Sequence, residues 1–147
     1  MSSQQYNPED SLGYLVGRAA RGLGTRLNRN FGLAGFTDVT CEQWAVLVTL
    51  WQKNGQSQQD LASISCKDKT SVTRLIDNME KHRLVVRIPG KTDKRQKFIY
   101  LTPRGHNRRK KLMKIVKRTL KEAQRGIKAA DIALCKKILS QVYENTK

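Results

Sequence analysis

The stretch Ile88-Pro-Gly-Lys-Thr-Asp-Lys-Arg-Gln-Lys-Phe-Ile-Tyr-Leu-Thr-Pro-Arg-Gly105 decides the fold, because it admits two readings. Its Gly90-Lys-Thr92 matches the end of a nucleotide-binding P-loop, which is a strand followed by G-x-x-x-x-G-K-[ST] and a helix. The first glycine of that motif would fall at Val85, and the chain continues into the β-branched and aromatic run Lys97–Leu101. The stretch therefore predicts a β-hairpin with a cationic tip, and the P-loop match is a coincidence.

Charge is the strongest signal in the composition. The 147 residues include 29 Lys and Arg against 12 Asp and Glu, a net charge of +17, and no acidic residue occurs between Lys94 and Lys121. Clustered positive charge favours an anionic partner, with nucleic acid first and an acidic membrane surface second. The alternative is a basic protein without such a partner.

Other classes of protein find little support. No apolar run approaches the roughly 20 residues that span a bilayer, and the first residues lack a signal peptide. Cys41, Cys66 and Cys135 are far apart, as expected of reduced thiols in a cytoplasmic protein. His82 and His106 have no partners at metal-ligand spacing, and no catalytic constellation or cofactor loop is apparent. We expect a soluble cytoplasmic, nucleoid-associated protein that is not an enzyme and has no metal, cofactor or membrane partner.

Helices are expected on both sides of the hairpin. Polar residues that favour helix N-termini precede each apolar-periodic segment, and residues 32–38 read as a loop. Strands are expected at Leu84–Ile88 and Gln96–Leu101. The expected helix starts are Asn7, Thr40, Ser57, Asp68, Thr102 and Lys128.

The fourth of these helices, expected to end near Arg83, has two distinct faces. Its apolar residues follow helical spacing and face a core: Val72, Leu75, Ile76 and Met79. Its polar face carries Thr70, Thr73, Arg74, Asp77, Asn78 and Lys81. Hydroxyl, amide and guanidinium groups read base edges in a major groove, but an ordinary solvated face fits this helix equally well.

The order of elements predicts the fold class. A short helix, a tight turn, a second helix and a charged hairpin form a winged helix-turn-helix. The chain is expected to be mainly α with a small β-hairpin wing, flanked by helices at both ends.

The sequence resembles the MarR family of bacterial transcriptional regulators from about Ser11 to the C-terminus. The pieces that carry the resemblance are Thr40-x-x-Gln43-Trp44-x-Val46-Leu47, Gln58-x-Asp60-Leu61-Ala62, Lys69-Thr-Ser-Val-Thr-Arg-Leu75, Asp93-x-Arg95 and Leu101-Thr102-x-x-Gly105. It is their order and the position of the Asp-x-Arg in the hairpin that make the match specific.

The resemblance implies a homodimer that binds a pseudo-palindromic operator, more often as a repressor than as an activator. Arg95 would enter the minor groove, where Asp93 would hold its guanidinium in position. The implied division is a loose segment over residues 1–10, a dimerisation helix over 11–36, a winged helix-turn-helix DNA-binding lobe over 37–102 and C-terminal dimerisation helices over 103–147. The dimerisation residues would include Leu12, Val16, Leu23, Met113, Val116, Leu120, Ile132, Leu139 and Val142.

The expected DNA contacts lie on the recognition helix, just before it, and on the wing. Lysines beside the wing would meet phosphates, which gives affinity without sequence information. The predicted set is Lys67, Lys69, Thr70, Ser71, Thr73, Arg74, Asn78, Lys91, Asp93, Lys94, Arg95 and Lys97. The cations that open the helix after Thr102, from Arg104 to Lys114, are expected to add phosphate contacts that flank the wing.

Small aromatic acids and phenols release DNA in many family members, from a cleft between the dimerisation helices and the DNA-binding lobe. Tyr14, Arg18, Trp44 and Trp51 are candidates to line such a cleft, although the two tryptophans also fit an ordinary core. The rival function is a non-specific architectural or RNA-associated nucleic-acid-binding protein, which would use the same charge without operator specificity.

Overall fold

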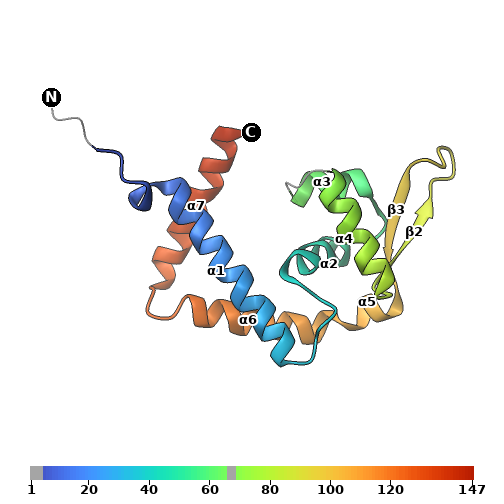
Figure 1. Ribbon diagram of the computed structural model, residues 1–147, viewed down its shortest axis with the longest axis horizontal. Coiled ribbons are helices and arrows are strands. Elements are labelled where there is room, and N and C mark those ends of the chain that lie inside the picture. Colours follow the sequence, from blue (N-terminus) through green and yellow to red (C-terminus); the bar gives the residue numbers. More distant parts are fainter. Residues whose placement is uncertain (1–4, 66–68) are drawn as a thin grey trace.

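The computed structural model describes residues 5–65 and 69–147. This part of the chain is mainly helical and carries one small antiparallel sheet (Figure 1). A short 3-10 helix, η1, covers Pro8–Asp10. The α-helices are α1 (Leu12–Leu33), α2 (Cys41–Gln52), α3 (Gln58–Ser65), α4 (Lys69–Lys81), α5 (Pro103–Asn107), α6 (Arg109–Ala123) and α7 (Ala129–Thr146).

The N-terminal helix begins later than the sequence predicts. Asn7 does cap a helix, since its side chain accepts a hydrogen bond from the N–H of Glu9 at 3.1 Å. That helix is only η1, because Ser11 is extended and restarts the helix by accepting from the N–H of Tyr14 at 3.3 Å. At its other end α1 runs to Leu33, two residues into the loop predicted for residues 32–38.

Local capping explains where three other helices start, as predicted. The Thr40 hydroxyl accepts from the N–H of Gln43 at 3.3 Å, and the Gln43 side chain accepts from the N–H of Thr40 at 3.0 Å. This reciprocal capping box satisfies two N–H groups that α2 itself leaves unpaired. Ser57 caps α3 through the N–H of Asp60 at 3.1 Å, and Thr102 caps α5 in the same way.

The sheet contains one strand more than the sequence predicts. Strands β2 (Val85–Pro89) and β3 (Lys97–Leu101) form the expected hairpin, in which Val85 faces Leu101 and Pro89 faces Lys97. A two-residue strand, β1 (Gln56–Ser57), pairs with β3 on its other side. The resulting order is β1-β3-β2, all antiparallel, so the wing is anchored to the start of α3.

The single helix predicted after Thr102 is broken at Arg108 into α5 and α6. The buried stripe of α6 consists of Leu112, Ile115 and Thr119, and it packs on α1. Thr119 accepts a hydrogen bond from the Asn30 side chain of α1 at 2.8 Å in this interior. The predicted seam Met113, Val116 and Leu120 lies beside this stripe, where Leu120 is 41% exposed.

One apolar core joins the winged helix to the flanking helices. Phe31 of α1, Leu47 of α2, Ile76 of α4, Ile99 of β3 and Leu112 of α6 are all fully buried in it. Figure 1 shows α2 to α5 and the sheet grouped on one side, while α1, α6 and α7 extend to the other. Within the described residues, no helix combines the length and apolarity needed to cross a membrane.

Candidate nucleic-acid interface

Helix α4 turns one face to the core and the other to solvent. Val72, Ile76 and Met79 are fully buried, as their spacing predicts. Arg74 and Asn78 are exposed on the other side, as is Ser71. A helix held in this way by its apolar face offers its polar face to a partner without any change in the core.

Arg87 of β2 ties this helix to the wing. Its Nη1 lies 2.6 Å from Oδ1 of Asp77 and 3.2 Å from Oε1 of Glu80, both on α4. Its Nη2 donates to the backbone oxygen of Thr73 at 3.2 Å, and its Nε donates to Gln58 of α3 at 3.2 Å. The Arg87 side chain is only 18% exposed. One guanidinium therefore fixes the positions of α3, α4 and β2 relative to one another.

The position of Thr73 differs from the prediction, which placed its hydroxyl on the solvent-facing side of α4 where it could contact a base edge. It is half-buried, and its hydroxyl accepts a hydrogen bond from Nε2 of Gln58 at 2.7 Å. It lies on the side of α4 that meets α3 and the wing, because it belongs to the network around Arg87. Its hydroxyl orients the Gln58 side chain.

The wing tip is a tight turn fastened by backbone contacts. The N–H of Gly90 donates to the Gln96 oxygen at 2.8 Å, and the N–H of Gln96 donates to the Asp93 oxygen at 3.2 Å. A Cβ on residue 90 would lie 2.6 Å from the Asp93 oxygen, so this position requires glycine. The Gly90-Lys-Thr92 tripeptide thus shapes a turn, as the hairpin reading predicts.

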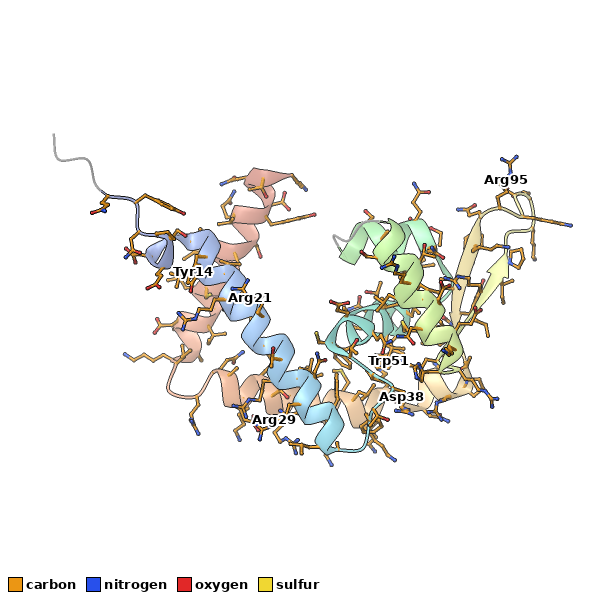
Figure 2. All side chains as sticks on the ribbon, in the orientation of Figure 1. Tyr14, Arg21, Arg29, Asp38, Trp51 and Arg95 are labelled. Carbon is orange, nitrogen blue, oxygen red and sulfur yellow. The ribbon has the colours of Figure 1, made fainter. Side chains whose placement is uncertain are left out.

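Asp93 acts on Arg95 differently from the expectation. Its Oδ1 accepts a hydrogen bond from the backbone N–H of Arg95 at 3.0 Å, and no bond to the Arg95 guanidinium is found among the described residues. The carboxylate stabilises the turn rather than the side chain, as aspartate commonly does at such positions. The Arg95 side chain is exposed and projects from the end of the wing (Figure 2).

A groove of about 590 Å3 separates the wing from α3 and α4. Its walls include Ser57, Gln58, Thr73, Asp93, Arg95 and Lys97. The structure therefore brings Thr73, Asp93, Arg95 and Lys97 of the predicted set to one surface. Lys91 and Lys94 are exposed on the same turn. Lys67 lies outside the described residues, as do the side chains of Lys69 and Thr70 at the start of α4.

A buried ion-pair cluster that sequence reasoning missed connects the lobe to α6. Asp38 is 9% exposed, and its Oδ2 accepts from Arg104 and from Arg108 at 2.7 Å each, while its Oδ1 accepts from Arg108 at 2.8 Å. The Arg108 guanidinium also lies 4.9 Å from the Phe36 ring centroid, over its face. Burial alone raises the pKa of Asp38, but the hydrogen bonds from Arg104 and Arg108 and the charge of Arg108 outweigh it and hold that pKa below 3.8.

This cluster corrects the prediction that Arg104 and Arg108 meet phosphates beside the wing. Both are occupied by Asp38, and the pairing sits where the helix breaks into α5 and α6. The sequence did carry a signal, because Asp38 is the only acidic residue between Asp10 and Glu42. A lone acid in a basic segment needs partners if it is buried.

The four candidate effector residues do not converge within one chain. Trp44 and Trp51 pack edge to face with centroids 5.4 Å apart, against the core, and Nε1 of Trp51 donates to the Gly105 oxygen at 3.1 Å. Tyr14 lies near the other end of the molecule (Figure 2). The tryptophans thus follow the core alternative, and Arg18 is exposed on α1.

The flanking helices expose apolar side chains. Leu12, at 54%, Val16, Leu23, Leu120 and Leu139 are exposed, whereas Met113, Val116, Ile132 and Val142 are half-buried. Helix α7 contains no buried residue over its 18 positions. An apolar groove of about 850 Å3 runs between α1, α6 and α7.

Groups of three or more potential metal ligands are absent from the described part of the chain.

Known proteins share these features. The MarR family model matches residues 39–97. The HTH-type transcriptional regulator FarR of Neisseria gonorrhoeae is 30% identical over 105 residues, which cover 71% of this chain and 68% of that protein. The transcriptional regulator PcaV of Streptomyces coelicolor, solved in complex with its natural ligand, matches with a TM-score of 0.85 at 17% identity, over 97% of this chain and 98% of that one.

A further solved structure is BpsR of Bordetella bronchiseptica, a protein whose DNA binding is regulated by 6-hydroxynicotinic acid. It matches with a TM-score of 0.84 at 18% identity, over 94% of this chain and 96% of that one. These similarities agree with the winged helix-turn-helix built by α2, α3, α4 and the hairpin. The chain belongs to the MarR family and is a DNA-binding transcriptional regulator.

Proposed function

We propose that the protein is a homodimeric repressor in which each winged helix binds one half of a pseudo-palindromic operator. Helix α4 enters the major groove with Ser71, Arg74 and Asn78. Arg95 enters the adjacent minor groove, because a narrow minor groove concentrates negative potential and attracts arginine. Lys91, Lys94 and Lys97 contact phosphates.

The observation that carries this proposal is the groove shared by the wing and the recognition helix. Thr73 of α4 and Arg95 of the wing line it together, and Arg87 fixes the spacing of the elements that carry them. A duplex that inserts one groove against α4 therefore meets the wing one groove further on. The tip carries four cations near a single carboxylate, Asp93, so the contact is electrostatically favourable.

Homodimerisation is supported by the apolar surface of the flanking helices. Several leucines on α1, α6 and α7 keep about half of their surface exposed, so they bury little area within one chain. A helix as long as α7 with no buried residue gains its main stabilisation from packing against another surface. A second copy of the chain supplies such a surface with two-fold symmetry.

An aromatic acid is the proposed effector class. The support is the regulation of BpsR by 6-hydroxynicotinic acid and the ligand bound to PcaV, both proteins of the same fold. Because Nε1 of Trp51 donates to the Gly105 oxygen of α5, an aromatic acid bound at the junction of the lobe with α5 is expected to quench the tryptophan fluorescence.

Selection from a random duplex pool followed by footprinting tests the proposed function. The expected result is one enriched motif, protected as two half-sites with centres 10–10.5 base pairs apart, about one helical turn. Insertion of five base pairs between the half-sites should abolish tight binding, because it rotates them to opposite faces of the duplex. Equal affinity for all sequences would instead favour the non-specific architectural function.

A further inference from the structure

A row of lysines follows the outer face of α6. Lys110, Lys114, Lys117 and Lys121 recur at spacings of four, three and four, so they share one side of the helix. All four are exposed. None of them forms an ion pair with another residue in the ranges 5–65 and 69–147. The lysine row is thus a stripe of unneutralised charge about 16 Å long, at 1.5 Å per helical residue.

This lysine row points away from the proposed DNA interface, which differs from the expectation that Lys110 and Lys114 add phosphate contacts beside the wing. The opposite side of α6 carries Leu112, Ile115 and Thr119, which are buried on α1. Figure 1 shows α6 along the edge of the molecule that lies opposite the wing tip. A straight duplex held by α4 and the wing therefore leaves the lysine row uncovered.

The surroundings of the row strengthen its charge. A shallow hollow of about 680 Å3 beside it is lined by His106, Arg109, Met113 and three of the lysines. Oε1 of Glu122, the acidic residue of α6, lies 4.0 Å from Nε of Arg118. Asp38 at the start of the helix is already bound by Arg104 and Arg108. Both of these acids are therefore paired with arginines rather than with the lysine row.

We propose that the lysine row of α6 is a second DNA-backbone site, which holds a second duplex segment while the wing and α4 hold the first. Lysines are point charges that suit phosphates without reading bases. Duplex DNA presents about one negative charge every 1.7 Å along its axis, so a 16 Å row of cations meets several phosphates at once. The inference rests on the proposed function only for the identity of the first duplex.

The same chemistry disfavours a membrane as the partner. Helices that lie on a bilayer bury an apolar face in it and keep the cationic face outward. The apolar face of α6 is occupied by α1 and the core. Met113 is the one apolar side chain that lines the hollow beside the lysine row, which is too little to insert into a bilayer. The evenly charged backbone of a duplex needs no apolar side chain.

Duplex bridging tests the proposal with the full chain. A biotinylated duplex on beads is saturated with protein, and capture of a second, fluorescent duplex of unrelated sequence is measured against salt. The variant changes Lys110, Lys114, Lys117 and Lys121 to Gln. The matched control removes the same charge from exposed lysines elsewhere: Lys53, Lys128, Lys137 and Lys147.

Wild type and control are expected to capture the second duplex, and the lysine-row variant is expected to capture at least about tenfold less of it. For capture by the variant, the slope of log K against log salt concentration should be lower by about three to four units, because four phosphate contacts are lost. Binding of the first duplex should stay within about twofold for all three proteins. Capture by the variant equal to wild type, an equal loss in the control, or an equal loss of first-duplex binding would each overturn the proposal. Capture of polyglutamate in preference to DNA would assign the row to acidic proteins instead. Failure of wild type to bind the first duplex would refute the proposed function separately.

Discussion

Replacement of Asp38 by Asn tests the cluster that joins the DNA-binding lobe to α6. The carboxylate accepts three hydrogen bonds of 2.7–2.8 Å from two arginines, and Arg108 is only 15% exposed. The variant keeps the shape but leaves Arg108 as a poorly compensated buried cation. Removal of one partner from a buried pair costs about 3–5 kcal/mol, so we expect a loss of this order in the free energy of unfolding.

The assay is urea unfolding followed by circular dichroism at one fixed protein concentration. Glu122→Gln is the control, because its exposed pair with Arg118 at 4.0 Å should contribute no more than about 1 kcal/mol. The two arginines hold the pKa of Asp38 below its ordinary value of 3.8 in the folded protein. Its stabilisation is therefore complete well above that ordinary value and is lost as the pH falls through the lowered folded value. The difference in unfolding free energy between wild type and Asp38→Asn should therefore be constant near neutral pH and narrow as the pH falls into the acidic range. An Asp38→Asn loss no larger than that of Glu122→Gln would refute the reasoning.

Three further substitutions probe other contacts. Thr40→Ala removes one half of the α2 capping box and should cost about 1 kcal/mol of unfolding free energy, measured by the same urea assay. Arg87→Lys replaces the planar guanidinium that reaches Asp77 and Thr73 with a single ammonium group. Its loss of operator-binding free energy should exceed its loss of unfolding free energy in the urea assay. Operator affinity equal to that of wild type would show that α4 is held without Arg87. Lys94→Ala should lower the salt slope of log K by about one unit on any duplex, and an unchanged slope would mean that Lys94 touches no phosphate.

Features set by neighbouring residues could be predicted from the sequence. The caps at Thr40, Ser57 and Thr102 follow from side chains that reach N–H groups only three residues away. The apolar stripe of α4 and the wing hairpin follow from periodicity within one segment. The order of these elements was sufficient for the winged helix-turn-helix.

Features set by distant residues could not be predicted. Strand β1 has two residues and exists because β3, more than 40 positions away, offers it a free edge. The break at Arg108 coincides with its pairing to Asp38, 70 residues earlier. Likewise, Thr73 carries a hydroxyl of the kind that contacts base edges, but Gln58 on another helix donates a hydrogen bond to that hydroxyl. The face of α6 that packs on α1 depends on Asn30 and on apolar residues of α1, which the periodicity of α6 alone does not reveal.

The affinity of Arg95→Ala for a selected operator fragment tests the central claim most directly, namely that the wing and α4 grip neighbouring grooves of one duplex. Arg95 is exposed and makes no contact that holds the fold through its side chain among the described residues, so the variant should unfold at the wild-type urea midpoint. We predict a loss of about 1–3 kcal/mol in operator binding, or roughly 5- to 150-fold in Kd. Wild-type affinity in the folded, dimeric variant would contradict the account.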